Sequence, residues 1–175
     1  DREAFLQLET VLKDILRRRH NQEPLRLWVV GCATGEEAYS LAILLAESVG
    51  GPANLEDRNY QIFATDVDSD ALGVARRGIY SESSLEDVPP EFKSRYFIRR
   101  GDDSYEVIKE LKSLVLFSGH NIIDDPPFLR IDLITCRNLL IYFEHDLQKK
   151  VYSIFHYSLA ASGYLFLGKS ESTSQ

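Results

Sequence analysis

Two glycines and two glutamates within one short stretch could form a ligand site. Gly31 and Gly35 follow an apolar run directly, and Glu36 and Glu37 come next. Glycine lets the backbone approach a ligand closely, and the start of a helix offers unpaired N–H groups. Dinucleotide sites use G-x-G-x-x-G and place a pyrophosphate at the helix start, where two carboxylates would repel it. The stretch therefore predicts a site for a nucleoside without phosphates.

S-adenosylmethionine is the commonest cofactor of that kind, and its sulfonium and amino groups are cationic. Asp66, at the end of a second apolar run, can accept hydrogen bonds from both ribose hydroxyls. An ordinary α/β turn, in which the glutamates only favour the helix start, remains the alternative. A site for a nicotinamide dinucleotide is a weaker alternative. Asp66 lies 35 positions after Gly31, whereas the acid that binds the ribose follows the glycines of the dinucleotide fingerprint by about 20 positions.

No metal site is expected. The acids at positions 66, 68 and 70 are spaced as in a calcium loop. However, the sixth position of that loop would be Ala71 and the twelfth Arg77, which excludes it. Cys32 and Cys136 lack zinc spacing and are expected to be reduced thiols of a cytoplasmic protein.

Apolar runs alternate with helical patterns along the chain, which predicts an α/β fold with a doubly wound sheet. The expected strands are 27–30, 60–65, 114–118, 131–136 and 163–168. The expected helices are 1–20, a helix ended by Gly50 and Gly51, 71–77 and 146–159. Ligands of open α/β sheets bind at the carboxyl ends of the strands. The residues expected there, beside Gly31 and Asp66, are Asn121, Arg137, Asn138 and Tyr142.

Residues 78–112 interrupt this alternation. A short helix over 91–96 and a hairpin of 97–100 with 104–108 predict a small inserted antiparallel β-subdomain. This subdomain is either a docking surface for a partner or an insertion without a function of its own. Residues 1–175, with this insertion, are expected to form one domain, since 44% of the chain is hydrophobic.

The charge of the chain limits its partners. A net charge of −7 and a pI of about 5.1 exclude the basic footprint of a nucleic-acid-binding protein. No apolar run is long enough to span a bilayer, so no membrane insertion is expected. The sequence holds no methionine and begins within a helical pattern, so we expect it to be part of a longer protein.

Five motifs together resemble the CheR family, chemotaxis protein-glutamate O-methyltransferases that use S-adenosylmethionine. They are GCATGEEAYS (31–40), ATDVD (64–68), GIY (78–80), CRNLLIYF (136–143) and GKSE (168–171). The match runs in order over nearly the whole chain. It is most similar to CheR domains of hybrid proteins that also carry methylesterase or sensory domains. The resemblance implies a Rossmann-like class I methyltransferase fold.

The resemblance also implies how the cofactor would be held, starting at the glycine turn around Gly31. Glu37 would bind the ammonium of the methionine portion, and Asp66 would bind the ribose hydroxyls. Asn121 and Ile122 would frame the adenine. S-adenosyl-L-homocysteine would be the product.

The catalytic centre implied by the resemblance lies in the CRNLLIYF motif. Asn138 and Leu139 would line the cofactor near the methyl donor, and Tyr142 would stand at the catalytic centre. The acceptor would be a glutamate of a chemoreceptor or related signalling protein. A glutamate is ionised at neutral pH, so the enzyme mainly has to align and desolvate it.

Departures from the family pattern leave a second function open. The family's N-terminal helical domain and closing strands are missing from this sequence. Its substrate-binding arginine falls one position before Asp1, unless Arg2 replaces it. Lys169 stands where chemotaxis members usually have histidine. The alternative is a non-catalytic CheR-like module that binds S-adenosylmethionine or docks signalling partners.

Overall fold

A parallel five-stranded sheet forms the centre of the computed structural model, which describes residues 2–20, 23–56 and 59–171. The strand order is β6-β2-β1-β7-β8, and every neighbouring pair is parallel. The strands are β1 (Leu25–Val30), β2 (Tyr60–Asp66), β6 (Val115–Gly119), β7 (Ile131–Cys136) and β8 (Leu159–Leu167). All five expected strands of the main sheet are confirmed, and β8 begins four residues earlier than expected.

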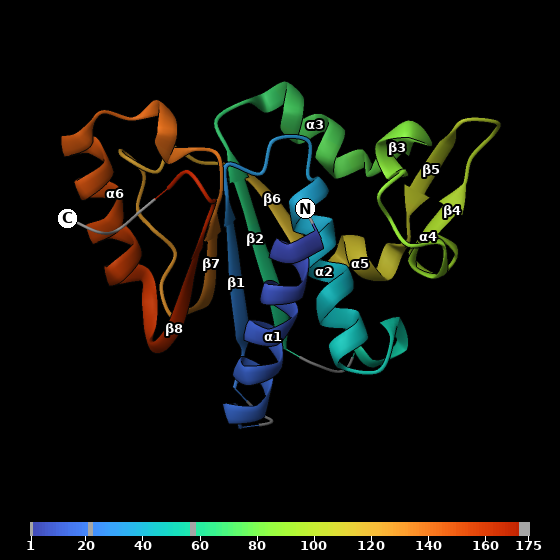
Figure 1. Ribbon diagram of the computed structural model, residues 1–175, viewed down its shortest axis with the longest axis horizontal. Helices are drawn as coiled ribbons and strands as arrows, with labels where there is room; N and C mark the ends of the chain where they lie inside the picture. The colour runs from blue at the N-terminus through green and yellow to red at the C-terminus, as the bar shows by residue number, and fades with distance from the viewer. Residues whose placement is uncertain (1, 21–22, 57–58, 172–175) are drawn as a thin grey trace.

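Helices cover both faces of this sheet (Figure 1), which confirms the doubly wound α/β fold. The helices are α1 (Arg2–Arg18), α2 (Glu36–Ser48), α3 (Ser69–Arg77), α4 (Pro90–Tyr96), α5 (Lys109–Leu114) and α6 (His145–Ser158). Short 3₁₀ turns are η1 (Pro52–Asn54), η2 (Ser83–Leu85) and η3 (Leu140–Tyr142). Residue 1, which was included in the first expected helix, lies outside the described residues.

Strand β1 shows why both faces are covered. Leu25, Leu27 and Val29 are buried in a cluster that includes side chains of α1 and α2. Trp28 and Val30 point to the opposite face, into a second cluster that includes Val151 and Phe155 of α6. Successive side chains of a strand alternate between faces, so a strand that is apolar throughout must be covered twice.

The carboxyl ends of four strands line up at one edge of the sheet. Val30 is paired with Thr65 on one side and with Cys136 on the other, and Asp66 is paired with Gly119. We call this edge, with the loops that leave it, the carboxyl edge; it is at the top of Figure 1. The register brings together loops that are far apart in the sequence.

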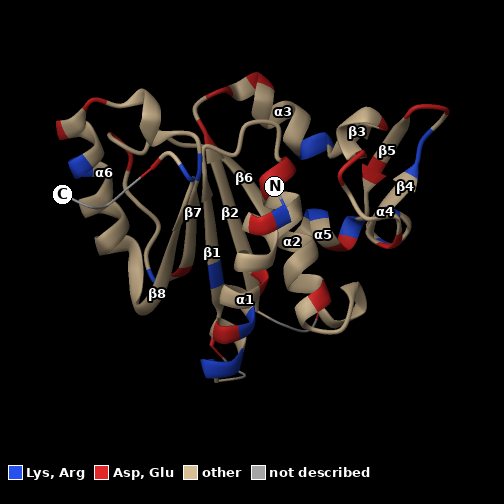
Figure 2. Cartoon of the chain, viewed as in Figure 1, with Lys and Arg blue, Asp and Glu red and all other residues tan. Residues whose placement is uncertain are grey.

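A small antiparallel sheet of order β3-β5-β4 lies at one end of the molecule (Figure 1). Its strands are β3 (Ile79–Ser81), β4 (Phe97–Arg99) and β5 (Ser104–Val107). The expected hairpin corresponds to β4 and β5, and β3 joins it as a strand that the sequence pattern did not indicate. Figure 2 shows acidic and basic residues interspersed on this sheet. Two ion pairs of Glu106, with Arg100 and Lys112, belong to it.

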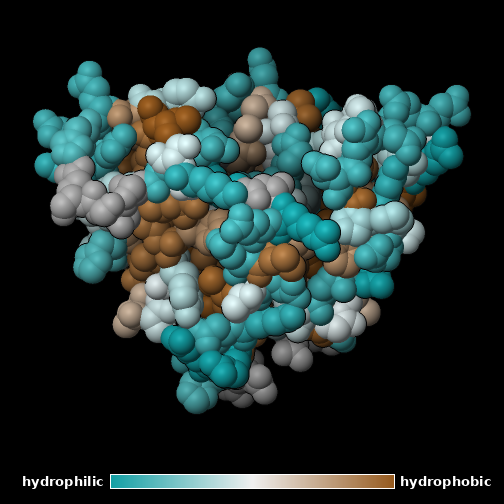
Figure 3. Space-filling view, viewed as in Figure 1, coloured by the Kyte–Doolittle hydropathy of each residue, from teal (hydrophilic) through white to brown (hydrophobic). Residues whose placement is uncertain are grey.

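The hydropathy of the surface differs from one part of the molecule to another. In Figure 3, apolar atoms gather over β8, between α1 and α6, whereas α1 and the small sheet are mostly hydrophilic. Most side chains of β8 are only half-buried, in contrast to those of β1. Among the described residues, no helix has the length and apolar character needed to cross a membrane.

Candidate functional site

The turn after β1 is a tight loop with a left-handed backbone at three positions. The φ angles of Gly31, Ala33 and Gly35 are 70°, 45° and 94°. The N–H groups of Gly31 and Cys32 both donate to the carbonyl oxygen of Thr65, at 2.8 and 2.9 Å. Only glycine adopts such φ values without strain, so the two glycines give the loop its shape. We call residues 31–35 the glycine loop.

Asp66 anchors this loop as well as facing the carboxyl edge. Its Oδ2 accepts the N–H of Ala33 at 2.9 Å, and its Oδ1 accepts the N–H of Asp68 at 3.0 Å. A carboxylate has about four acceptor positions, so both oxygens keep capacity for a ligand's hydroxyl groups. Asp68 in turn caps α3, by accepting the N–H groups of Asp70 and Ala71.

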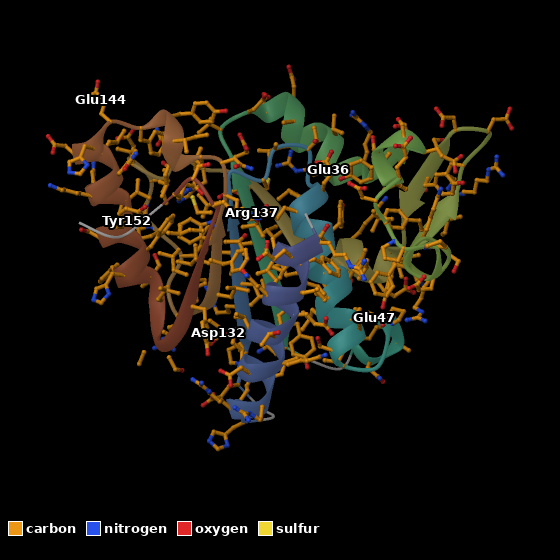
Figure 4. The ribbon with its side chains drawn as sticks, viewed as in Figure 1. Glu36, Glu47, Asp132, Arg137, Glu144 and Tyr152 are labelled. Atoms are coloured by element: carbon orange, nitrogen blue, oxygen red, sulfur yellow. The ribbon has the colours of Figure 1, made fainter. Side chains whose placement is uncertain are left out.

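Glu37 lies in the first turn of α2 and faces Arg137, which follows β7. Their charged groups are 3.7 Å apart, and both side chains are more than two thirds buried. Burial raises the pKa of Glu37, and the nearby charge of Glu171 adds to this effect. The Thr135 hydroxyl and the Arg137 guanidinium oppose it by lowering the pKa. Figure 4 shows Arg137 at the middle of the carboxyl edge.

Thr135 is a polar residue in an otherwise apolar stretch of β7. Its side chain is fully buried, and its hydroxyl forms no hydrogen bond of ordinary geometry with the described residues. Because the hydroxyl still influences the Glu37 carboxylate, the two groups are neighbours. Thr135 therefore places a buried hydroxyl beside the Glu37 carboxylate, at the end of β7.

The loop after β7 meets the glycine loop. A Cβ built on Gly31 would lie 3.3 Å from Cδ2 of Leu139, so the two residues are in close contact. Asn138 has a left-handed backbone with φ 57°, and η3 follows. Tyr142, on η3, has a side chain that is 77% exposed. We call residues 137–142 the β7 loop.

Asn121 and Ile122 follow β6, but their side chains have local roles. Oδ1 of Asn121 accepts the N–H of Ile123 at 3.0 Å, and its Nδ2 donates to Asp124 at 2.8 Å. Ile122 is buried in the apolar cluster around Trp28. The carboxyl edge brings both residues near Asp66, since the N–H of His120 donates to the carbonyl oxygen of Asp66. Their contact with adenine stays a prediction.

Two residues that hold the site were not expected from the sequence. Tyr80 of β3 donates its hydroxyl to the carbonyl oxygen of Thr34, at 2.7 Å, and so supports the glycine loop. Glu171, after β8, accepts four backbone N–H groups, three of them from the β7 loop. Both belong to motifs of the resemblance, GIY and GKSE, which was the signal available.

The two cysteines are not reactive groups of this site. Burial and the neighbouring charge of Asp66 raise the pKa of Cys32 to about 12, and burial raises the pKa of Cys136 further. Both remain protonated thiols at neutral pH, whereas thiolates are the nucleophiles and metal ligands. Within the ranges that the structure describes, His, Cys, Asp and Glu side chains form no group of three that could hold a metal ion.

Comparisons with known proteins match the whole chain to one family. The family model "CheR methyltransferase, SAM binding domain" matches residues 1–175. "Chemotaxis protein methyltransferase 2" of Vibrio cholerae is 36% identical, over 96% of this chain and 58% of that protein. "Chemotaxis protein methyltransferase" of Salmonella typhimurium is 37% identical, over 94% of this chain and 57% of that protein. An uncharacterized 104.1 kDa protein of Rhodobacter capsulatus is 39% identical, over the whole chain but 18% of that protein. The chain thus spans less than two thirds of the length of these relatives.

Solved structures share the fold at low sequence identity. The crystal structure of DszA carbon methyltransferase superposes with a TM-score of 0.56 at 16% identity, covering 89% of this chain and 31% of that one. The DhpI–SAH complex has a TM-score of 0.51 at 12% identity, covering 89% of this chain and 53% of that one. The parallel sheet with helices on both faces is therefore the class I methyltransferase fold.

Proposed function

The chain belongs to the CheR methyltransferase family, in which it matches the SAM-binding domain, and from this we propose that it methylates glutamate carboxylates of a signalling protein. The relatives named chemotaxis protein methyltransferases support this assignment. The acceptor would be a chemoreceptor-type protein, with S-adenosylmethionine as the methyl donor. We further propose that residues 1–175 act as one methyltransferase domain in which residues 78–112 form an inserted β-subdomain.

The observation that carries the proposal is the pair of acids on either side of the glycine loop. Glu37 is a largely buried carboxylate that faces a single, loosely spaced guanidinium, so it can hold a cation. Asp66 keeps acceptor capacity for two hydroxyl groups, and the glycine loop presents backbone between the two acids. The buried Thr135 hydroxyl beside Glu37 offers a further polar contact. These groups fit the ammonium and ribose of S-adenosylmethionine, and the acids disfavour a pyrophosphate.

The residues of the chain would mainly bind and align the reactants. Bound S-adenosylmethionine supplies an activated methyl carbon, so no general base is needed. The acceptor glutamate is already ionised at neutral pH, because the ordinary pKa of a glutamate lies well below 7. Asn138 and Leu139 would hold the cofactor side of the β7 loop. Tyr142, exposed at the rim, would contact the incoming carboxylate and exclude water from it.

Calorimetric titration with S-adenosylhomocysteine tests the cofactor site. We expect saturable binding that Asp66→Ala weakens by about 10- to 100-fold, as for the loss of hydrogen bonds to a charged group. Asp66→Asn keeps the size of the side chain and guards against a collapsed loop. Asp70→Asn removes an exposed acid from the same rim and should bind as well as wild type. Equal affinity in all variants would overturn the role of Asp66.

Methyl transfer requires a separate experiment. The chain is incubated with methyl-labelled S-adenosylmethionine and a chemoreceptor cytoplasmic fragment. Alkali-labile label on the fragment, lost with Tyr142→Ala, is the expected result, because glutamate methyl esters hydrolyse in base. Cofactor binding by the chain without methyl transfer would instead favour the non-catalytic module.

A further inference from the structure

Glu171 has an unusual set of hydrogen bonds for a surface-edge glutamate. Its Oε1 accepts the N–H groups of Leu139 and Leu140, at 2.9 and 2.8 Å. Its Oε2 accepts the N–H groups of Asn138 and Gly168, at 3.2 and 2.8 Å. The side chain is half-buried. Hydrogen bonds to an ionised acceptor are stronger than neutral ones, so this carboxylate holds four backbone groups in place.

Three of the four donors are consecutive residues at the start of η3. The first N–H groups of a helical turn have no partner within the turn, and a capping side chain usually supplies one. Leu139, which precedes η3, offers no side-chain cap. Glu171, which is 31 to 33 residues away in the sequence, therefore supplies the hydrogen-bond acceptor that a local capping side chain would supply.

The surroundings of the carboxylate leave no spare room. A Cβ built on Gly168 would lie 2.6 Å from Oε2 of Glu171 and 3.4 Å from the backbone nitrogen of Asn138. Glycine at this position is what lets β8 end so close to the β7 loop. Gly168, the Glu171 carboxylate and the backbone of Asn138 are thus packed closely together.

The segment that Glu171 holds is the one that carries the candidate catalytic residues. Leu139 lies against Gly31, and the N–H of Tyr142 donates to the carbonyl oxygen of Leu139 at 3.1 Å. A shift of the β7 loop would therefore move Leu139 away from the glycine loop and move Tyr142 with it.

We propose that Glu171 is a positioning residue of the methyltransferase site, whose carboxylate fixes the β7 loop against the glycine loop before the cofactor binds. It acts through the backbone of residues 138–140, not by touching the cofactor or the acceptor. The role of the loop in binding rests on the proposed function. The hold of Glu171 on the loop does not, and the two parts can be tested separately.

Amide hydrogen exchange of the ligand-free chain tests the hold on the loop. Glu171→Gln keeps the volume but turns an N–H₂ group toward the backbone donors, and Glu171→Ala removes the acceptor. In both variants we expect faster exchange at positions 138–140 and 168, with the strands β1 and β2 unchanged. Unchanged exchange at these amides would overturn the proposal, whatever the chain's activity.

Titration with S-adenosylhomocysteine tests whether the contacts of Glu171 with the β7 loop support cofactor binding. We expect Glu171→Ala to weaken binding about tenfold or more. Glu171→Asp, or added acetate with Glu171→Ala, should restore part of the affinity, which a general loss of stability would not allow. Glu47→Gln is the matched control, because Glu47 is also half-buried and hydrogen-bonded, by Arg95 and Tyr96, but lies at the other end of α2 (Figure 4). It should leave the affinity unchanged.

The combined results separate the two ideas. Faster exchange with unchanged affinity would overturn the positioning role and would remove the β7 loop from the cofactor site. Weaker binding in Glu47→Gln as well would show a global effect and overturn the assignment to Glu171. If the wild-type chain does not bind S-adenosylhomocysteine at all, the cofactor site itself fails, while the exchange result still decides the hold on the loop.

Discussion

Glu37 is an acid whose charge the ligand-free protein stabilises poorly. Burial raises its pKa, and Arg137 and Thr135 offset this only in part, while Glu171 works against them. The raised pKa of Glu37 determines the direction in which the free energy of unfolding changes with pH. The contribution of Glu37 to folding is fully present below its ordinary pKa of 4.5 and is lost as pH rises through the raised value. A second cation beside Glu37, in addition to Arg137, would recover this loss.

The pH dependence of cofactor binding should therefore report on Glu37. We expect the affinity for S-adenosylhomocysteine to fall as pH is lowered through the raised pKa of Glu37, so that the loss begins above pH 4.5. Glu37→Gln should bind more weakly at neutral pH and lose this step. Calorimetry across the pH range measures both profiles. Parallel profiles of the two proteins would exclude Glu37 as the group that holds the ammonium.

Gly35 is required for two separate reasons, which a pair of substitutions can separate. Its φ is 94°, and a Cβ there would lie 2.8 Å from the Cβ of Ala75. Gly101 has a similar φ of 81° but no atom within 4 Å of the added Cβ. We expect Gly101→Ala to reduce the free energy of unfolding by about 1 kcal/mol and Gly35→Ala by about 2–4 kcal/mol. Urea unfolding measures both, and equal losses would mean that Ala75 can move aside.

At the scale of elements, the small sheet supports the glycine loop. Tyr80 of β3 is buried and reaches across to Thr34. Its ring packs edge-on against Tyr39 of α2, whose hydroxyl donates to the carbonyl oxygen of Ala75 in α3. The small sheet thus contributes a structural support to the glycine loop, in addition to any role as a docking surface.

Removal of one hydroxyl tests this support. We expect Tyr80→Phe to weaken S-adenosylhomocysteine binding by about three- to tenfold, as one lost hydrogen bond predicts. Tyr105→Phe is the matched control, because Tyr105 is paired with Tyr80 across the small sheet, but its hydroxyl donates to Glu82, at 3.4 Å, instead of to the glycine loop. The control should bind like wild type. If the two variants bind equally, β3 does not support the loop.

The elements differ in how far the sequence predicts them. Long strands and helices have a clear apolar period, and Gly50 and Asp68 mark helix ends by their own chemistry. The three residues of β3 and the six of α5 are too short to show a period, so their structure depends on tertiary pairing. The candidate site residues follow from their position after strands and from the resemblance. They are Gly31, Glu37, Asp66, Asn121, Ile122, Asn138, Leu139 and Tyr142. The contacts of Glu171 could not be predicted, because they exist only once β8 lies beside β7.

At the scale of the whole molecule, the two apolar clusters share the same strands. Trp28, the only tryptophan, reports on the cluster under α6, while Leu27 beside it belongs to the cluster under α1 and α2. Strands common to both clusters should make the chain unfold as one unit.

Phe155→Ala tests that coupling. Phe155 is fully buried, so its truncation should reduce the free energy of unfolding by about 3–5 kcal/mol. Trp28 fluorescence and far-ultraviolet circular dichroism should shift together. Tyr157→Ala, on the same helix but 69% exposed, should change the free energy of unfolding by about 0.5 kcal/mol or less. A fluorescence transition that precedes the dichroism transition would show that the α6 side melts separately.

The position of β1 at the centre of the sheet has a consequence for synthesis on the ribosome. One edge of β1 is paired with β2, which follows soon in the chain, but the other waits for β7. About a hundred residues separate Val30 from Ile131, so at 5–20 residues per second the wait is about 5–20 s. During that time an apolar strand edge is open to other nascent chains. Fewer nascent chains at one time, or chaperones that cover such edges, should therefore raise the soluble yield of this protein.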